Sequence, residues 1–102
     1  MTTRKHATPS LAAIRERIDG IDAELVELIA ERQRWVVAAG THKTDDASVR
    51  APARVEQVIA KVRGLAVEAG ASPEVVEHTY RAMISAFINL ELAEVTARTR
   101  AD

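Results

Sequence analysis

The feature that most constrains this chain is a long stripe of apolar residues in its first half. Between residues 11 and 39, these side chains recur at alternating steps of three and four, the spacing of a heptad seam. Thr8, Pro9 and Ser10 are typical of a helix start, and Gly40 is the first residue that favours an end. The pattern predicts one long helix whose seam must pack against another helix. The seam consists of Leu11, Ile14, Ile18, Ile21, Leu25, Leu28, Arg32, Trp35 and Ala39.

Two more helices are predicted in the rest of the chain. Pro52 favours the start of the second, and Gly70 favours its end as a C-cap. Ser72-Pro73-Glu74 starts the third, which is expected to run to about Thr96, and the polar segment 41–51 is expected to be a loop. No window alternates with period two, so the fold class is all-α with a long, a shorter and a medium helix. The second seam is Val55, Val58, Val62, Leu65 and Ala69, and the third is Val76, Tyr80, Met83, Ile84, Phe87, Ile88, Glu91 and Val95.

The length and composition favour a shared core. The 102 residues suffice for one domain, expected over residues 10–98 after a disordered tail at residues 1–9. A chain this short buries only roughly 60–65% of its unfolded surface, so a second copy would enlarge a thin core. Apolar residues make up 47% of the chain but aromatic residues only 3%, which favours helix-on-helix packing of small aliphatic side chains. A homodimer is therefore expected.

Several classes of function are disfavoured. The net charge of −1, from 14 basic and 15 acidic residues, argues against nucleic acid as the main partner. The chain has no cysteine, and its three histidines show no metal-ligand spacing, so neither a metal nor a cofactor is expected. No apolar run approaches the length of about 20 residues that spans a membrane. No apolar stretch follows the basic residues of segment 1–9 as in a secretory signal, so a cytoplasmic location is expected.

Two charged residues interrupt the apolar seams. Arg32 lies on the first seam, where a guanidinium without an anionic partner would cost several kcal/mol if buried. It therefore either binds an anionic ligand, forms a structural ion pair, or extends to the surface. Glu91 lies on the third seam, four residues after Phe87. Burial there favours a protonated carboxyl group that donates a hydrogen bond, and the alternative is a buried salt bridge with Arg32 or another cation.

Further basic residues flank these positions. Lys43 follows Arg32 by eleven residues and would share its face if the helix continued that far. Arg15 is seventeen residues before Arg32, about 25 Å along a helix, which is too far for one metabolite to reach both. If two copies cross antiparallel around a two-fold axis between Ala23 and Glu24, however, Arg15 of one chain meets Arg32 of the other. Arg54, at the start of the second helix, is either a further ligand-binding residue or a surface residue.

These residues together resemble a known family. The run Leu11-Ala-Ala-Ile-Arg15-Glu-Arg-Ile18-Asp19, then Ile21-Asp22, Leu28-Ile-Ala-Glu-Arg32 and Gly40-Thr-His-Lys43, is similar to the first helix of the all-helical chorismate mutases. The resemblance extends over roughly residues 10–96, and the combination of motifs is more specific than any one of them. It implies an intertwined homodimer of three-helix protomers with two equivalent sites for a small dianionic substrate.

The resemblance also implies a role for each site residue. Arg15 from the partner chain and Arg32 would bind the substrate carboxylates. Lys43 would contact a carboxylate and the ether oxygen between the ring and the enolpyruvyl group, which protonated Glu91 would contact from the other side. Arg54 would seat the ring carboxylate or close the site.

The chain departs from the mutase pattern beside the substrate ring. Ala51 and Val55 occupy positions where mutases often carry acids for the C4 hydroxyl of chorismate, and Phe87 replaces a small polar residue. The run Ala51-Pro-Ala-Arg54-Val55 is instead similar to isochorismate pyruvate lyases, which share the fold. Chorismate mutase activity is preferred from the sequence. The alternatives are the lyase, an enzyme of amino-substituted chorismate, and a non-catalytic helical dimer with a regulatory role.

Overall fold

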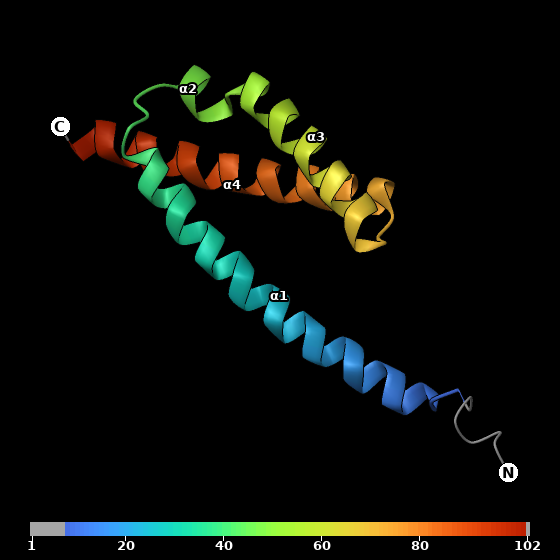
Figure 1. Ribbon diagram of the computed structural model, residues 1–102. Helices are drawn as coiled ribbons and strands as arrows, with labels where there is room; N and C mark the ends of the chain where they lie inside the picture. The colour runs from blue at the N-terminus through green and yellow to red at the C-terminus, as the bar shows by residue number, and fades with distance from the viewer. Residues whose placement is uncertain (1–7, 102) are drawn as a thin grey trace, which may run out of the picture. The chain divides into compact units, whose positions relative to one another are not determined.

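Every regular element in the computed structural model is a helix within residues 8–101, the part of the chain that the structure describes (Figure 1). Of the expected disordered tail, residues 1–7 lie outside this range, and residues 8–10 precede the first helix. The chain divides into two compact units, residues 1–34 and residues 35–102, and each is described by itself. The helices are α1 (Leu11–Gly40), α2 (Asp46–Arg50), α3 (Pro52–Ala69) and α4 (Pro73–Ala101). The all-α prediction and its three main helices are confirmed.

Within residues 1–34, the apolar seam of α1 is exposed. Its six aliphatic positions before Arg32 are between 38% and 61% exposed. Val26 and Ile29 add further exposed apolar surface, at 65% and 41%. Continuous apolar stripes of this length are rarely left in water, because each exposed aliphatic side chain forgoes about 1.5–3 kcal/mol of burial free energy. The helix itself forms as predicted, and its seam needs a partner.

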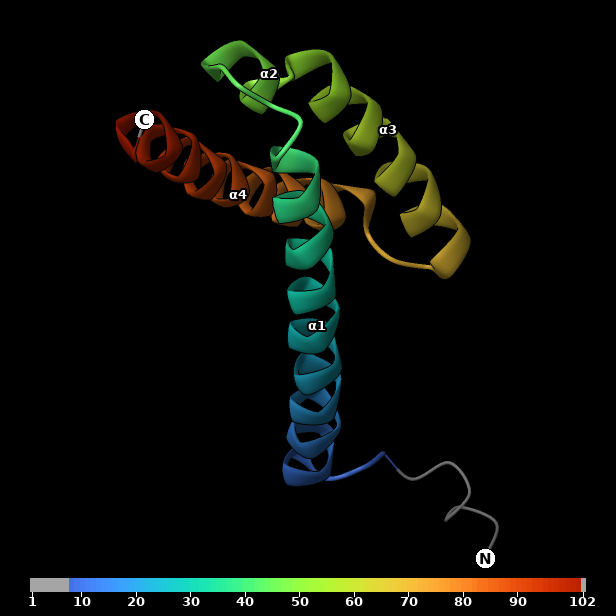
Figure 2. The same cartoon turned by 90° about the vertical axis from the view of Figure 1, so that its left-hand side faces the viewer.

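The core of residues 35–102 lies between α3 and α4, which Figures 1 and 2 show side by side. Ile59, Val62 and Ala66 of α3 are at most 6% exposed, and the predicted α4 seam is buried or half-buried throughout. On α3, however, the predicted seam is partly wrong. Leu65 is 50% exposed, and the buried face is turned toward Ile59 and Ala66 instead. Steps of three and four fit both stripes on this Val- and Ala-rich helix, so packing against α4 decides between them.

The predicted loop at residues 41–51 contains a short helix. Asp45 caps α2, since the Ser48 N–H donates to Asp45 Oδ1 at 2.8 Å and the Asp45 N–H donates to Ser48 Oγ at 3.4 Å. The side chains that favour a turn thus form a capping box, and Val49, 3% exposed, anchors the helix in the core. Ala51 joins α2 to α3 with a φ of 37°, a left-handed backbone that costs a non-glycine residue about 1–2 kcal/mol.

The two ends of the α3–α4 connection follow the predicted signals. Pro52 begins α3, and Gly70 ends it in the left-handed conformation with a φ of 77°. Pro73 begins α4, and the Val75 N–H donates to Ser72 Oγ at 3.2 Å as the N-cap bond. At its other end α4 extends five residues past the expected Thr96, to Ala101.

Ion pairs connect the exposed sides of α3 and α4. Arg81 donates to both carboxylate oxygens of Glu56 at 2.9 Å and to Glu77 at 2.7 Å. Arg63 donates to the other oxygen of Glu77 at 2.7 Å. Hydrogen bonds from Arg81 lower the pKa of Glu56 and of Glu77 below their ordinary value of 4.5. The network therefore depends on ionised carboxylates.

We expect this network to contribute to acid sensitivity. Because the two pKa values are lower in the folded than in the unfolded chain, the network stabilises the fold above pH 4.5. That contribution is lost as the pH falls from 4.5 through the folded-state values. Urea denaturation from pH 7 to pH 3 should show a smaller acid loss in Arg81→Gln than in the wild type. Identical pH dependence of the two proteins would contradict this assignment.

Candidate active site

Lys43 lies in the turn that follows α1. The helix ends at the buried Gly40, and the N–H groups of Thr41, His42 and Lys43 donate in turn to the carbonyls of Ala38, Ala39 and Gly40, at 3.1–3.3 Å. The helix therefore ends before Lys43. Lys43 and Arg32 do not lie on one helix face, which would have required the helix to continue to Lys43. The turn instead directs the Lys43 side chain toward α4, where its ammonium group donates to Glu91 Oε2 at 3.0 Å.

Glu91 is buried on the inner face of α4. Its 5% exposure makes it the only charged residue in the buried class among the residues that the structure describes. The carboxylate lies against the end of α1, where a Cβ added to Gly40 would be 3.8 Å from Glu91 Oε2. Since its partner Lys43 is 26% exposed at the side chain, the pair is half open to solvent. Of the two alternatives for Glu91, the structure has the salt bridge, with Lys43 as the cation.

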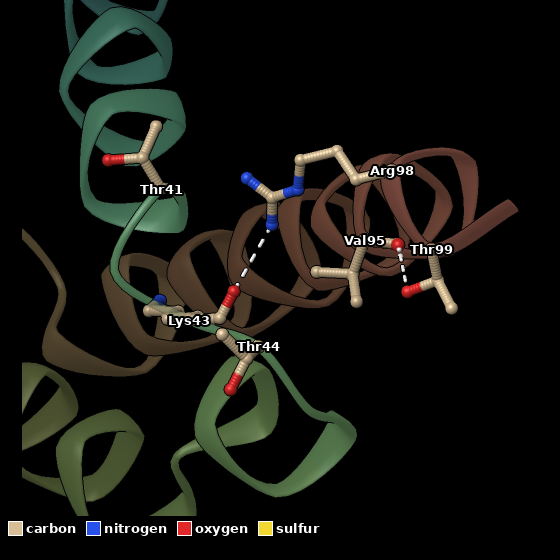
Figure 3. Close-up of a pocket in the computed structure, with 6 residues that line it drawn as sticks. All are labelled: Thr41, Lys43, Thr44, Val95, Arg98 and Thr99. Carbon is tan, nitrogen blue, oxygen red and sulfur yellow. Dashed lines mark hydrogen bonds between the residues drawn. The ribbon is translucent and has the colours of Figure 1, made fainter. Parts of the chain in front are cut away.

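An open pocket lies on the other side of the Lys43 turn. Figure 3 shows its lining side chains, which come from the turn and from the last turns of α4. Arg98 donates through Nη2 to the carbonyl oxygens of Lys43 at 3.1 Å and of Gly40 at 3.3 Å. The sequence does not indicate this role for Arg98, because a contact with a turn 55 residues earlier leaves no local signal. The lining residues are Thr41, Lys43, Thr44, Val95, Arg98 and Thr99.

Three predicted site residues lie on α3 and α4. Val55, in the first turn of α3, and Phe87, one turn before Glu91 on α4, are both half-buried. Arg54 is exposed, and its Nη1 donates to Gln57 Oε1 at 2.6 Å. The structure thus gives Arg54 a partner on its own helix.

Arg15 and Arg32 both lie on α1, within residues 1–34. Arg15 is exposed, and Arg32 is half-buried on the seam. Because the two lie on one straight helix, seventeen residues separate them by about 25 Å. A small ligand cannot bind both arginines of one chain.

Comparison with known proteins identifies the family of this chain. Residues 14–92 match the family described as chorismate mutase type II. The chain belongs to that family. It is also 35% identical over 78 residues to the isochorismate pyruvate lyase of Pseudomonas aeruginosa, a match that covers 76% of this chain and 77% of the relative. The resemblance inferred from the first-helix motifs is confirmed.

No described helix is long and apolar enough to cross a membrane. No group of three or more His, Asp or Glu side chains within residues 8–101 is arranged to hold a metal ion.

Proposed function

We propose that this chain is a cytoplasmic pericyclic enzyme that binds a dianionic enolpyruvyl ether in a site shared by two subunits. The observation that carries this proposal is the buried carboxylate of Glu91, joined to the Lys43 ammonium group 3.0 Å away at the end of α1. A buried ion pair seldom stabilises a fold more than apolar side chains of similar volume would. Stability alone is therefore a weak reason for this pair. A donor pair that faces a bound ether oxygen gives these two groups a chemical role.

The dimer supplies the remaining cations. Covering the exposed α1 stripe with a second copy around a two-fold axis between Ala23 and Glu24 brings Arg15 of the partner chain beside Arg32. These two arginines would bind the two carboxylates and hold the enolpyruvyl group over the ring. Fixing this compact conformer removes much of the entropic barrier, without any nucleophile.

Lys43 and Glu91 would act on the bond that breaks. As the C–O bond of the ether lengthens, negative charge develops on its oxygen. Lys43 donates to that oxygen from one side. Glu91 would donate from the other side as the neutral acid, which requires one proton taken up from water when the substrate binds. Fixed donors placed where charge develops lower the barrier most, because they need no reorganisation during the reaction.

Among the possible substrates, we propose isochorismate, which would be cleaved to salicylate and pyruvate. In this reaction a ring hydrogen moves to the enolpyruvyl methylene carbon while the C–O bond breaks, so no external acid or base is consumed. Ala51 and Val55 offer no acceptor for a C4 hydroxyl, and isochorismate carries its hydroxyl beside the ring carboxylate instead. The identity to the P. aeruginosa lyase supports the same substrate.

The second candidate is the rearrangement of chorismate to prephenate, which was preferred from the sequence. The family description over residues 14–92 supports it. In this reaction the same C–O bond breaks while a C–C bond forms. The same cations would bind the carboxylates and the ether oxygen. The difference between the two reactions rests on the ring contacts near Val55 and Phe87.

Product analysis decides between these candidates. The purified protein is incubated separately with isochorismate and with chorismate, and the products are separated by chromatography. We expect salicylate and pyruvate from isochorismate, with at most slow formation of prephenate from chorismate. Prephenate as the main product would replace the lyase by the mutase. No turnover of either substrate would contradict catalysis and favour a non-catalytic helical dimer.

The role of Glu91 predicts a dependence on pH. If catalysis requires a proton on Glu91, the rate should fall as the pH rises and this proton is lost. Glu91→Gln keeps a donor at every pH, so the variant should retain its activity over the alkaline range in which the wild type loses it. Rate profiles from pH 5 to pH 9 for both proteins test this expectation. Parallel profiles would reject the donor role of Glu91.

A further inference from the structure

We propose that Arg98 is a positioning residue for Lys43, an inference that rests on the catalytic role proposed for that lysine. Glu91 and Arg98 are one heptad apart on α4, and both bond to Lys43. Figure 3 shows the Arg98 side chain beside the turn that carries this lysine. Glu91 binds the lysine at its ammonium group, and Arg98 binds it at its carbonyl oxygen. Lys43 is therefore fixed at both its backbone and its side-chain end by a single helix.

Arg98 also secures the end of α1. Its Nη2 lies 3.3 Å from the carbonyl oxygen of Gly40, which already accepts the Lys43 N–H at 3.1 Å. The last carbonyls of a helix have no intrahelical donors, and a cation beside them is favourable to the helix dipole. The guanidinium group thus joins the last residue of the helix to the first turn residue that bears a functional side chain.

Apart from Lys43, the turn residues at 41–44 are exposed. Thr41 and Thr44 are exposed, and the Thr41 hydroxyl donates back to Ala38 within the end of α1. Without Arg98, the carbonyls of Gly40 and Lys43 would turn to water, and the Lys43 backbone could shift against Glu91. A shift of about 1 Å in a reacting group can cost about a hundredfold in rate.

Arg98→Ala and Arg98→Lys test this proposal, with Arg100→Ala as the matched control. Arg100 is an exposed arginine in the same last turn of α4. We expect Arg98→Ala to lower kcat about 10- to 100-fold with a smaller change in KM, because the lysine acts on the developing charge. Arg98→Lys should recover part of this loss, since one ammonium group can replace one of the two carbonyl contacts. Arg100→Ala should remain close to the wild type.

A double-mutant cycle with Lys43→Met distinguishes positioning from direct action. If Arg98 acts through Lys43, then Arg98→Ala should cause little further loss in a protein that already lacks the lysine. The same fold-loss in both backgrounds would overturn the proposal and would indicate that Arg98 acts on the substrate itself or on the fold.

Amide hydrogen exchange separates the failure of this inference from the failure of the proposed function. In Arg98→Ala, the Lys43 amide should exchange faster than in the wild type, while Arg100→Ala should leave it unchanged. Full activity of Lys43→Met would refute the catalytic role of the lysine, whatever the exchange result. Unchanged exchange in Arg98→Ala would refute the positioning role alone.

Discussion

Lys43→Met is expected to lower kcat/KM by a factor of about 10² to 10³, the usual cost of removing one fixed donor to a developing oxyanion. Methionine keeps most of the length and the apolar stem of lysine but cannot donate a hydrogen bond. The ether oxygen would then have Glu91 as its one remaining donor. Steady-state kinetics on the preferred substrate, at enzyme concentrations high enough to follow slow turnover, measure the loss.

The same substitution removes the ammonium partner of the buried Glu91, so loss of structure is a second route to lower activity. We expect a cost of about 1–3 kcal/mol in the free energy of unfolding, because a charged hydrogen-bond partner is removed from a buried group. The double variant Lys43→Met/Glu91→Gln removes the unpaired charge and should recover most of this stability without recovering activity. Recovery of both together would mean that the pair has only a structural role.

Arg32→Ala is expected to lower kcat/KM at least a hundredfold, which corresponds to about 3 kcal/mol of lost transition-state binding. The guanidinium group would hold a substrate carboxylate in two parallel hydrogen bonds, which alanine cannot make and lysine can make only in part. Arg32→Lys should therefore lie between the alanine variant and the wild type.

Arg34→Ala is the matched control for Arg32. It removes an exposed arginine two residues further along α1, about 200° around the helix and so on the opposite face. Its kcat/KM should stay within about twofold of the wild type, since exposed charges far from a ligand contribute little. Equal losses in the two variants would assign the effect to the general charge of α1 rather than to a bound carboxylate.

The fold was predictable from sequence where the signals are local. The start of α3 at Pro52 and its end at Gly70 follow from residues that act through backbone conformation. The face of α3 that is buried, and the continuation of α4 to Ala101, depend on contacts with other helices. Leu65 is exposed and Ile59 is buried because α4 packs against one of two possible stripes, a choice that no spacing within α3 contains.

The candidate site shows the same division. Glu91 could be predicted as buried because it is a charged residue on an apolar stripe, and its exposure of 5% confirms this. Its partner Lys43 could not be derived from helical periodicity, since the lysine lies in the turn beyond Gly40. The contacts of Arg98 were missed for a related reason. The Arg98 side chain binds backbone carbonyl oxygens. Because every residue has a carbonyl oxygen, the sequence does not indicate which of them it binds.

The central claim is that Arg15 and Arg32 of different subunits form one site, and mixing two inactive variants tests it most directly. Arg15→Ala and Arg32→Ala are each purified, unfolded together and refolded as a mixture. A heterodimer then contains one site with both arginines and one with neither, so activity should recover to about a quarter of the wild-type value at random assembly. A mixture no more active than the two separate variants would contradict the shared site.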